Sequence, residues 1–180
     1  QQGHKVSIYE KEKVTGGLAV GFREPGWKWS LEKAYHHWFT NDTFARSLAE
    51  ELSHTVLTKR PSTDVYVQGK RVPLDSPLSL LTFPYLSLPS RFRTGFAALY
   101  LKLISDYKQF EGRKAIPWIR RWMGEASFKT IWNPLFTGKF GASKNDVALT
   151  WFWARIKKRT PSLAYPEGGF QAFANRIAEE

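Results

Sequence analysis

The segment Lys5–Gly17 most constrains what this chain of 180 residues can fold into. It reads Lys-Val-Ser-Ile-Tyr-Glu, then five mostly basic and polar residues, then the adjacent glycines Gly16 and Gly17. Its first part predicts a β-strand that ends in the carboxylate of Glu10. In a nucleotide-binding βαβ unit the second strand presents an acidic side chain at this place, where it accepts the ribose hydroxyls of an adenosine. The segment therefore predicts one half of a dinucleotide site.

The other half of such a site is not in the sequence. A glycine-rich phosphate-binding turn is expected roughly 20 residues before the acidic residue, but the chain begins at Gln1. At the other end, Phe170, Phe173 and Ile177 recur at helical spacing, and no glycine or proline follows them. We expect an internal segment of a longer protein, with a chain that truly starts at Gln1 as the alternative.

Composition limits the class of protein. A hydrophobic content of 42% and an aromatic content of 16% suffice for a compact core. The chain has no cysteine, which excludes disulfides, thiolate nucleophiles and cysteine-ligated metals. No apolar run approaches the roughly 18–20 residues of a spanning helix, and the start shows no signal-peptide pattern. We expect a soluble, cytoplasmic protein that would need a bound cofactor for redox chemistry.

The formal net charge is +11, which raises the question of a nucleic-acid partner. The basic residues are spread along the chain, and their densest cluster, Arg155–Arg159, falls in the last turn of a predicted helix, where cations complement the helix dipole. We therefore expect a solvated basic face and no nucleic acid. The alternatives are an anionic substrate and a peripheral contact with anionic lipid.

The pattern of apolar residues predicts a mostly helical chain of the α+β class. Helices are expected after Asn41 or Asp42, from Ser90 onward, over 116–123, 127–132 and 146–158, and from Gly169 onward. Val65–Val67 and Lys70–Val72 predict a β-hairpin around Gln68 and Gly69. An irregular connection or a short hairpin is expected over 20–29.

Apolar stripes indicate which faces should be buried. The helix from Ser90 carries one stripe, which we expect to lie in the core: Phe92, Phe96, Leu99, Tyr100, Leu103 and Tyr107. On the earlier helix the expected buried face is Phe44, Leu48 and Leu52. The proline-rich apolar segment 78–89 is expected to wall an apolar pocket.

His36 and His37 are candidate proton carriers. Adjacent residues cannot face the same way on a strand or a helix, so one imidazole is expected to be structural. The other could titrate near neutrality beside a cofactor or substrate. Packing among the neighbouring aromatic residues is the alternative for both. A metal site is not expected, because no third ligand has metal-like spacing.

Two glycine-containing corners are candidate binding elements. The segment Gly138–Gly141 lacks the spacing of a phosphate-binding loop, so a tight corner is expected there. Its Lys139 is a candidate contact for an anionic substrate group. Gly168 and Gly169 open the last predicted helix, and a plain helix start is the alternative to a role in binding. The sequence contains no convincing Ser-His-Asp set or carboxylate pair.

Together these segments resemble the FAD-dependent amine oxidase superfamily, which includes protoporphyrinogen oxidases, phytoene desaturases and, more remotely, UDP-galactopyranose mutases. Glu10 followed after five residues by Gly16-Gly17 is similar to its ribose-binding acid and glycine pair. Three later segments are similar to its bacterial protoporphyrinogen-oxidase-like branch: Tyr35–Phe39, Pro134–Gly141 and Tyr165–Phe170. The resemblance covers nearly the whole chain.

The resemblance implies a Rossmann-type FAD-binding domain interrupted by a helical substrate domain, with hydride passing from a small organic substrate to flavin N5. Residues 1–19 would be a remnant of the FAD-binding domain, 20–167 the substrate domain, and 168–180 the return to the FAD-binding domain. The implied FAD contacts are Glu10, Lys11, Gly16, Gly17, Gly168 and Gly169. His36 or His37 would lie near the flavin, and Lys139 near the substrate.

The chain departs from the family pattern in two places. Many relatives have an arginine at the position of Val14, whereas the basic residues here are Lys11 and Lys13. The glycine turn that would precede the first segment is missing, so the isolated chain is expected to bind FAD poorly and to be inactive. The alternatives are a mutase-like flavoenzyme acting on a sugar nucleotide and a basic helical binding module without catalysis. The oligomeric state is not fixed by the sequence.

Overall fold

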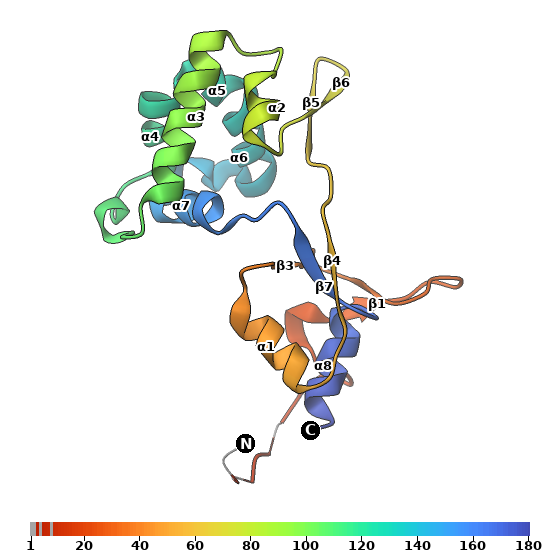
Figure 1. The fold of residues 1–180 in the computed structure, drawn as a ribbon. Helices are drawn as coiled ribbons and strands as arrows, with labels where there is room; N and C mark the ends of the chain where they lie inside the picture. Colours follow the sequence, from red (N-terminus) through yellow and green to blue (C-terminus); the bar gives the residue numbers. More distant parts are fainter. Residues whose placement is uncertain (1–2, 4, 8) are drawn as a thin grey trace. The chain divides into compact units, whose positions relative to one another are not determined.

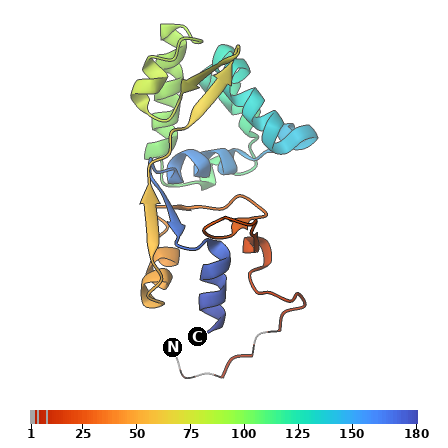
Figure 2. The same cartoon turned by 90° about the vertical axis from the view of Figure 1, so that its right-hand side faces the viewer.

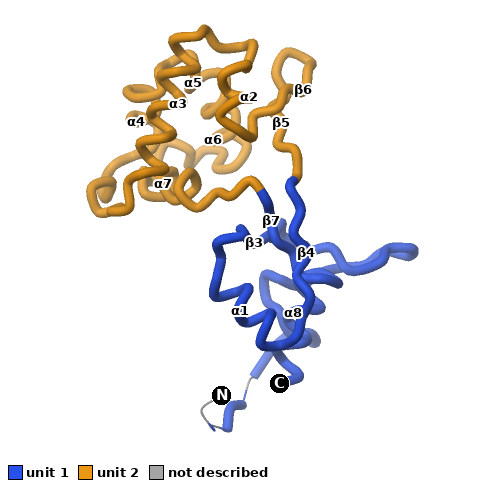
Figure 3. Tube along the Cα trace, in the orientation of Figure 1, with its two compact units in different colours: residues 1–60, 162–180 blue, residues 61–161 orange. Residues whose placement is uncertain are grey.

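A computed structural model of the chain describes residues 3, 5–7 and 9–180. It separates into two compact units (Figures 1 and 3). Unit 1 comprises residues 1–60 and 162–180, so it is built from both ends of the chain, and unit 2 comprises residues 61–161. Helices and small antiparallel sheets occur together, which confirms the α+β class.

Unit 2 is mainly helical, as expected. Its α-helices are α2 (Pro77–Leu81), α3 (Leu88–Leu103), α4 (Ala115–Met123), α5 (Glu125–Ser127), α6 (Asn133–Phe140) and α7 (Leu149–Lys158). A π-helix covers Phe128–Trp132, and 3-10 helices cover Lys108–Phe110 and Gly141–Asp146. The core between α3, α4, α6 and α7 is apolar and includes the fully buried Leu101, Ile119, Phe136 and Phe152. The predicted helices over 116–123 and 127–132 are confirmed within this unit.

Two lysines join the carboxyl ends of α3 and α7. The Lys102 ammonium donates to the carbonyls of Lys157 at 3.0 Å and Arg159 at 2.8 Å. Lys157 returns a bond to the carbonyl of Lys102 at 2.9 Å. Each ammonium thus satisfies the free carbonyls at the end of the other helix. Burial, together with the charge of Lys157, lowers the pKa of Lys102.

The predicted hairpin is present in unit 2. Strands β5 (Asp64–Val67) and β6 (Lys70–Pro73) pair antiparallel, with Val65 opposite Val72. Gln68 and Gly69 form the two-residue turn with φ values of 49° and 79°. Positive φ at both positions matches the right-handed twist of the strands, and glycine adopts it without strain.

Unit 1 contains a three-stranded antiparallel sheet in the order β3-β7-β4, with bounds Trp38–Phe39, Leu163–Pro166 and Val56–Lys59. The hairpin β1–β2 (Gly21–Phe22, Leu31–Glu32) confirms the expectation for residues 20–29. Helices α1 (Thr43–Glu51) and α8 (Phe170–Ala178) complete the unit, and a 3-10 helix covers Gly17–Ala19. Its small core is Ala49, Leu52 and Phe173, with Trp38 and Val56 beside them.

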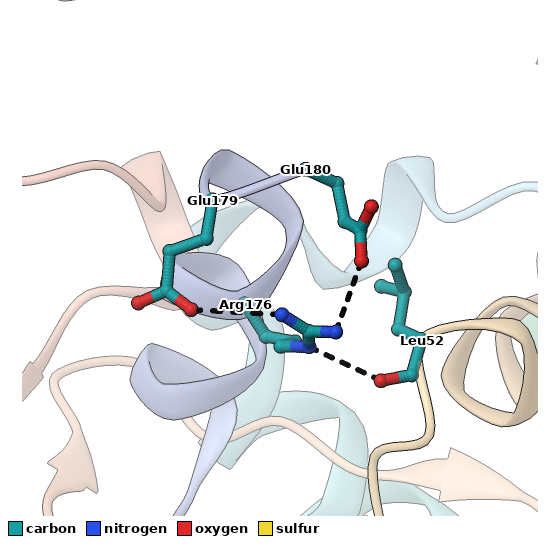
Figure 4. A network of polar contacts seen from close by, with 4 residues as sticks. All are labelled: Leu52, Arg176, Glu179 and Glu180. Atoms are coloured by element: carbon teal, nitrogen blue, oxygen red, sulfur yellow. Dashed lines mark hydrogen bonds and ion pairs between the residues drawn. The ribbon is translucent and has the colours of Figure 1, made fainter.

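Arg176 fastens α8 to the end of α1. Its Nε donates to the carbonyl oxygen of Leu52 at 3.1 Å, and its guanidinium also pairs with Glu180 at 2.9 Å and Glu179 at 3.8 Å (Figure 4). The bond to Leu52 satisfies a carbonyl just past the end of α1. Helices from opposite ends of the chain are therefore tied within one unit.

Three expectations about helix faces and corners were wrong in whole or in part. The stripe expected from Phe92 to Tyr107 is exposed, because α3 packs through another face that carries Thr94, Ala97 and Leu101. On α1 the expected buried face is right for Leu52, which is buried beside Ala49, and wrong for Phe44 and Leu48, which are 92% and 39% exposed. The expected corner at Gly138–Gly141 is the last turn of α6, and the chain turns only at Gly141, which has a φ of 53°.

The amino-terminal strand predicted up to Glu10 is not formed in the residues that the structure describes, 5–7 and 9–10; Ile8 lies outside them. A strand needs a hydrogen-bonding neighbour, and the described sheets provide none for this segment. Across the described ranges, no helix is both long and apolar enough to cross a membrane.

Candidate functional site

The glycine pair of the amino-terminal segment packs against α8. A Cβ placed on Gly16 would lie 3.4 Å from the Cβ of Ala174. Gln171 holds this approach, because its amide donates to the carbonyl of Thr15 at 2.8 Å and its oxygen accepts from the backbone N–H of Gly21 at 3.2 Å. One side chain of α8 thus fixes both ends of the glycine-containing turn.

Gly16 and Gly17 differ in what surrounds them. Gly16 has a φ of 124° and faces α8, whereas Gly17 has a φ of 52° and has nothing within 4 Å of a Cβ placed on it. Gly16 is therefore packed against α8, and Gly17 is accessible. Because a positive φ is readily adopted by glycine alone, the backbone at Gly17 is open to close approach by a ligand.

A second glycine corner opens α8. Gly168 and Gly169 have φ values of 83° and 91°. A Cβ on Gly169 would lie 2.7 Å from the backbone oxygen of Ser30, and one on Gly168 would lie 2.9 Å from the Cβ of Ala172. The corner consequently excludes side chains, and Ser30, next to strand β2, packs directly onto it.

A buried carboxylate occupies the amino-terminal end of α8. Glu32 is 8% exposed, and its Oε1 accepts hydrogen bonds from the backbone N–H of Phe170 at 3.0 Å and from the hydroxyl of Tyr165. Burial raises the pKa of Tyr165, and the hydrogen bond and negative charge of Glu32 raise it further. Tyr165 therefore stays a neutral donor at physiological pH. Since Glu32 already takes the first N–H of α8, the Gly168–Gly169 corner is suited to positioning the helix more than to binding a phosphate there.

The two histidines contact different neighbours. The ring of His36 lies 5.6 Å from that of Phe170, and its Nδ1 is hydrogen-bonded to the carbonyl of Ala34. The ring of His37 lies 5.1 Å from that of Tyr35 and 5.0 Å from that of Phe39. The structure brings the ring of His36 to Phe170, the first residue of α8, and packs His37 among aromatic rings. Their catalytic role stays a prediction.

The remaining candidate residues have other neighbours in the structure. Glu10 is exposed, and its Oε1 accepts a hydrogen bond from the backbone N–H of Glu12 at 2.9 Å, while Lys11 is exposed beside it. Lys139 belongs to unit 2, where its ammonium lies 5.9 Å from the ring centroid of Trp151. The roles of these three residues in binding stay predictions.

An open depression adjoins the corner at Gly169. It has a volume of about 340 Å³ and is lined by Trp27, Lys28, Trp29, Ser30 and Leu31. Lys28 lies over the ring of Trp29, 5.0 Å from its centroid. The lining consists of the apolar rings of Trp27 and Trp29 and the cation of Lys28, beside the glycine corner Gly168–Gly169. In the described part of the chain, no group of three or more His, Cys, Asp or Glu residues could hold a metal ion.

Sequence reasoning missed the residues that organise this site. Gln171, Glu32 and Tyr165 come from three separate segments, and each is an ordinary polar residue beside apolar ones. Only the pairing of distant segments in unit 1 brings them together. The glycine pairs were the available signal, and all four of these glycines have positive φ in the structure.

Comparison with known proteins agrees with the resemblance noted in the sequence. A solved structure from Exiguobacterium sp. 255-15, whose protein is assigned as a protoporphyrinogen oxidase, aligns with a TM-score of 0.52 at 14% identity. The alignment covers 91% of this chain and 42% of that one, so this chain spans less than half of that protein. No curated protein matches the sequence. The model of the flavin containing amine oxidoreductase family matches residues 1–180, and the chain therefore belongs to that family.

Proposed function

We propose that this chain is the part of a protoporphyrinogen-oxidase-like flavoenzyme that joins one edge of the FAD site to the substrate domain. The reaction would be oxidation of a small organic substrate, with FAD as the hydride acceptor. Membership of the family supports the general assignment of the chain to a flavin-dependent oxidoreductase. The observation that carries the finer proposal is the packing of Gly16-Gly17 onto α8, which leaves Gly17 open.

The residues of unit 1 fit the edge of a flavin site. Gly17 offers bare backbone with positive φ, and the Gln171 contacts keep that backbone in place from behind. Glu10 lies at the end of the preceding segment with an exposed carboxylate, as contact with a ribose would require. The proposed FAD contacts of this chain are therefore Glu10 and the backbone at Gly16 and Gly17.

The other residues of unit 1 would position this edge. Glu32 and the hydroxyl of Tyr165 hold the start of α8, and α8 in turn holds the glycine pair through Gln171. His36, packed on Phe170, is the candidate for holding a proton near the cofactor. When bound, the flavin supplies the redox chemistry, which no side chain of this cysteine-free chain provides.

The flavin content of variants tests the proposal. The protein that carries this segment within a complete FAD-binding domain is purified, and its ratio of flavin to protein is measured by absorbance. Gly17→Ala and Glu10→Ala should lower that ratio, because they block the open backbone and remove the ribose acceptor.

Gly26→Ala is the matched control. Gly26 also lies in unit 1, has a φ of 85° and has nothing within 4 Å of a Cβ placed on it. The alanine in each variant adds a similar backbone strain of about 1–2 kcal/mol. A lower flavin content in Gly17→Ala than in Gly26→Ala would therefore report the loss of a contact with the ligand. Equal flavin content in Gly17→Ala, Glu10→Ala, Gly26→Ala and the parent protein would contradict the proposal.

A further inference from the structure

The side chains of this chain that can be oxidised are mostly aromatic. The sequence has no cysteine and one methionine, but eight tryptophans and seven tyrosines. The methionine, Met123, is fully buried. Accessible thiols and thioethers are the groups that oxidants attack most readily, and their first oxidation products can be reduced again. Because neither group is accessible in this chain, the indole and phenol rings are left to supply an electron to an oxidant.

Three of these rings form a column between helices α3 and α4 of unit 2. Trp118 and Trp122 are four positions apart on α4, so they lie on one face of that helix, and their rings stack with centroids 6.1 Å apart. The ring of Tyr100, on α3, stacks on that of Trp122 at 6.5 Å with an interplanar angle of 12°. The two helices pack against each other, and both views place α3 on the outside of the helices of unit 2 (Figures 1 and 2). Trp118, Trp122 and Tyr100 are called the aromatic column below.

The aromatic column runs from the core of unit 2 to its surface. Trp118 is 7% exposed and belongs to the apolar core, where its ring lies 6.3 Å from that of Phe152. Trp122 and Tyr100 are 52% and 43% exposed. A stack of oxidisable rings therefore connects a buried indole with solvent.

The phenol at the outer end of the column is suited to hold an oxidised state. The hydroxyl of Tyr100 donates a hydrogen bond to Oε1 of Gln109 at 3.0 Å. A phenol that loses an electron becomes a strong acid, and because Tyr100 is half-exposed its proton can pass to water. The product is a neutral radical. An indole that loses an electron and keeps its proton is a cation, which the apolar surroundings of Trp118 disfavour.

We propose that the aromatic column carries one-electron oxidation from the core of unit 2 to its surface. A radical oxidant removes one electron from the indole of Trp118 or Trp122. An electron from Tyr100 refills that indole through the stacked rings, and the phenol proton goes to water. A soluble reductant of the ascorbate or thiol class then returns one electron, and water returns the proton, which restores the hydroxyl of Tyr100.

The net result of these steps is that the reductant gives one electron to the oxidant. The O–H bond of Tyr100 breaks and forms again, and every other bond of the chain is unchanged. The aromatic column thus keeps permanent oxidation products out of the apolar core around Trp118. This function lies within unit 2 and does not depend on the proposed flavin contacts of unit 1.

Pulse radiolysis of the 180-residue chain tests the proposal, with the azide radical as the one-electron oxidant. Azide radicals oxidise indole rings, and the absorbance of the indolyl radical should decay as that of the tyrosyl radical appears. The rate should not depend on protein concentration, because the aromatic column lies within one chain. Tyr100→Phe and Trp122→Phe should each lose this phase, since phenylalanine preserves an aromatic ring but is not oxidised by the azide radical.

Two tyrosine variants are the matched controls. Tyr66→Phe removes a phenol that is 72% exposed in the same unit and lies outside the aromatic column, and it should keep the phase. The rings of Tyr107 and Trp153 lie 6.0 Å apart and can contribute a phase of their own. Tyr107→Phe should remove only that contribution and leave the phase that depends on Tyr100.

Peptide mass spectrometry after continuous radiolysis locates the oxidation products. In Trp122→Phe the products should increase at Trp118 and decrease at Tyr100, because the column is interrupted between them. In Tyr66→Phe the products at both residues should match those of the parent chain. Circular dichroism confirms that each variant is folded, and Tyr100→Phe alone decides the kinetic test if Trp122→Phe is unstable, since it removes only a half-exposed hydroxyl.

Several outcomes would overturn the proposal. These are a transfer phase that is unchanged in Tyr100→Phe, a rate that rises with protein concentration, and an equal loss of the phase in Tyr66→Phe. Equal oxidation of Trp118 in the parent chain and in a folded Trp122→Phe would also overturn it, because Trp122 would then not lie on the route.

Discussion

Replacing Glu32 by alanine tests whether one buried carboxylate holds the start of α8. In Glu32→Ala the buried N–H of Phe170 and the half-buried hydroxyl of Tyr165 both lose their acceptor. A buried donor left unsatisfied costs about 1–3 kcal/mol, and the Tyr165 hydroxyl should recover part of its loss from water. We expect Glu32→Ala to lower the free energy of unfolding of unit 1 by about 2–4 kcal/mol.

Two further variants separate the acceptor from the charge. Glu32→Gln keeps an oxygen acceptor but loses the charge assistance, so it should cost about 1 kcal/mol. Glu24→Ala removes an exposed carboxylate from the same unit and should change stability by no more than about 0.5 kcal/mol. Combining Glu32→Ala with Tyr165→Phe should give a coupling free energy of about 1 kcal/mol, because the two side chains share one hydrogen bond.

The assay is urea unfolding followed by circular dichroism, with hydrogen exchange at the amides of α8 as the local probe. The local probe is needed because the two units of the chain need not unfold together. If Glu32→Ala were as stable as Glu24→Ala, and α8 kept its protection from exchange, the buried carboxylate would not hold α8 and the reasoning would be refuted.

Three other predictions follow from the described contacts. The pKa of Tyr165 is higher in the folded chain than in the unfolded chain. Its contribution to stability should therefore be full below about pH 10 and should be lost as the pH rises through the folded value. The free energy of unfolding, measured against pH, should fall less steeply in this range in Tyr165→Phe than in the parent chain. Lys102→Met and Lys157→Met should each lower the free energy of unfolding, measured by thermal denaturation, by about 1–2 kcal/mol. Each removes the hydrogen-bond donor of carbonyls at the end of α3 or α7. Lys108→Met should leave the free energy of unfolding unchanged. Gly169→Ala should cost at least about 2 kcal/mol more than Gly26→Ala in urea unfolding, because its Cβ meets the backbone oxygen of Ser30 at 2.7 Å; similar losses in both variants would contradict the close packing of that corner.

Local chemistry made part of the fold predictable. The turn at Gln68-Gly69 and the two short apolar runs beside it were enough to predict the β5–β6 hairpin. Helical spacing also placed α4 and α7. Helix α6 was missed because Pro134 and Gly138 look like breakers in the sequence, although proline is tolerated in the first turn of a helix.

The face on which a helix is buried was harder to predict than the helix itself. Phe92, Phe96 and Leu103 form the larger apolar stripe of α3, yet the helix packs through Ala97 and Leu101. Spacing identifies the faces of a helix, but the neighbours that cover a face come from elsewhere in the chain. The expected core stripe is instead exposed in the part of the chain that the structure describes.

Part of the candidate site was also predictable. Gly16-Gly17 and Gly168-Gly169 stood out as adjacent pairs, and all four residues have positive φ. Gln171 and Glu32 did not stand out, because their partners lie 150 and 138 residues away in the sequence. A contact of that separation has no local signature, so only the folded chain reveals it.

Hydrogen exchange with and without FAD tests the central claim most directly. In the protein that carries this segment within a complete FAD-binding domain, added FAD should protect the backbone amides of residues 15–21, where Gln171 holds the glycine pair. The β5–β6 hairpin of unit 2 serves as the internal reference and should be unchanged. Unchanged exchange over residues 15–21 in a protein that binds FAD would contradict the claim that this turn forms an edge of the flavin site.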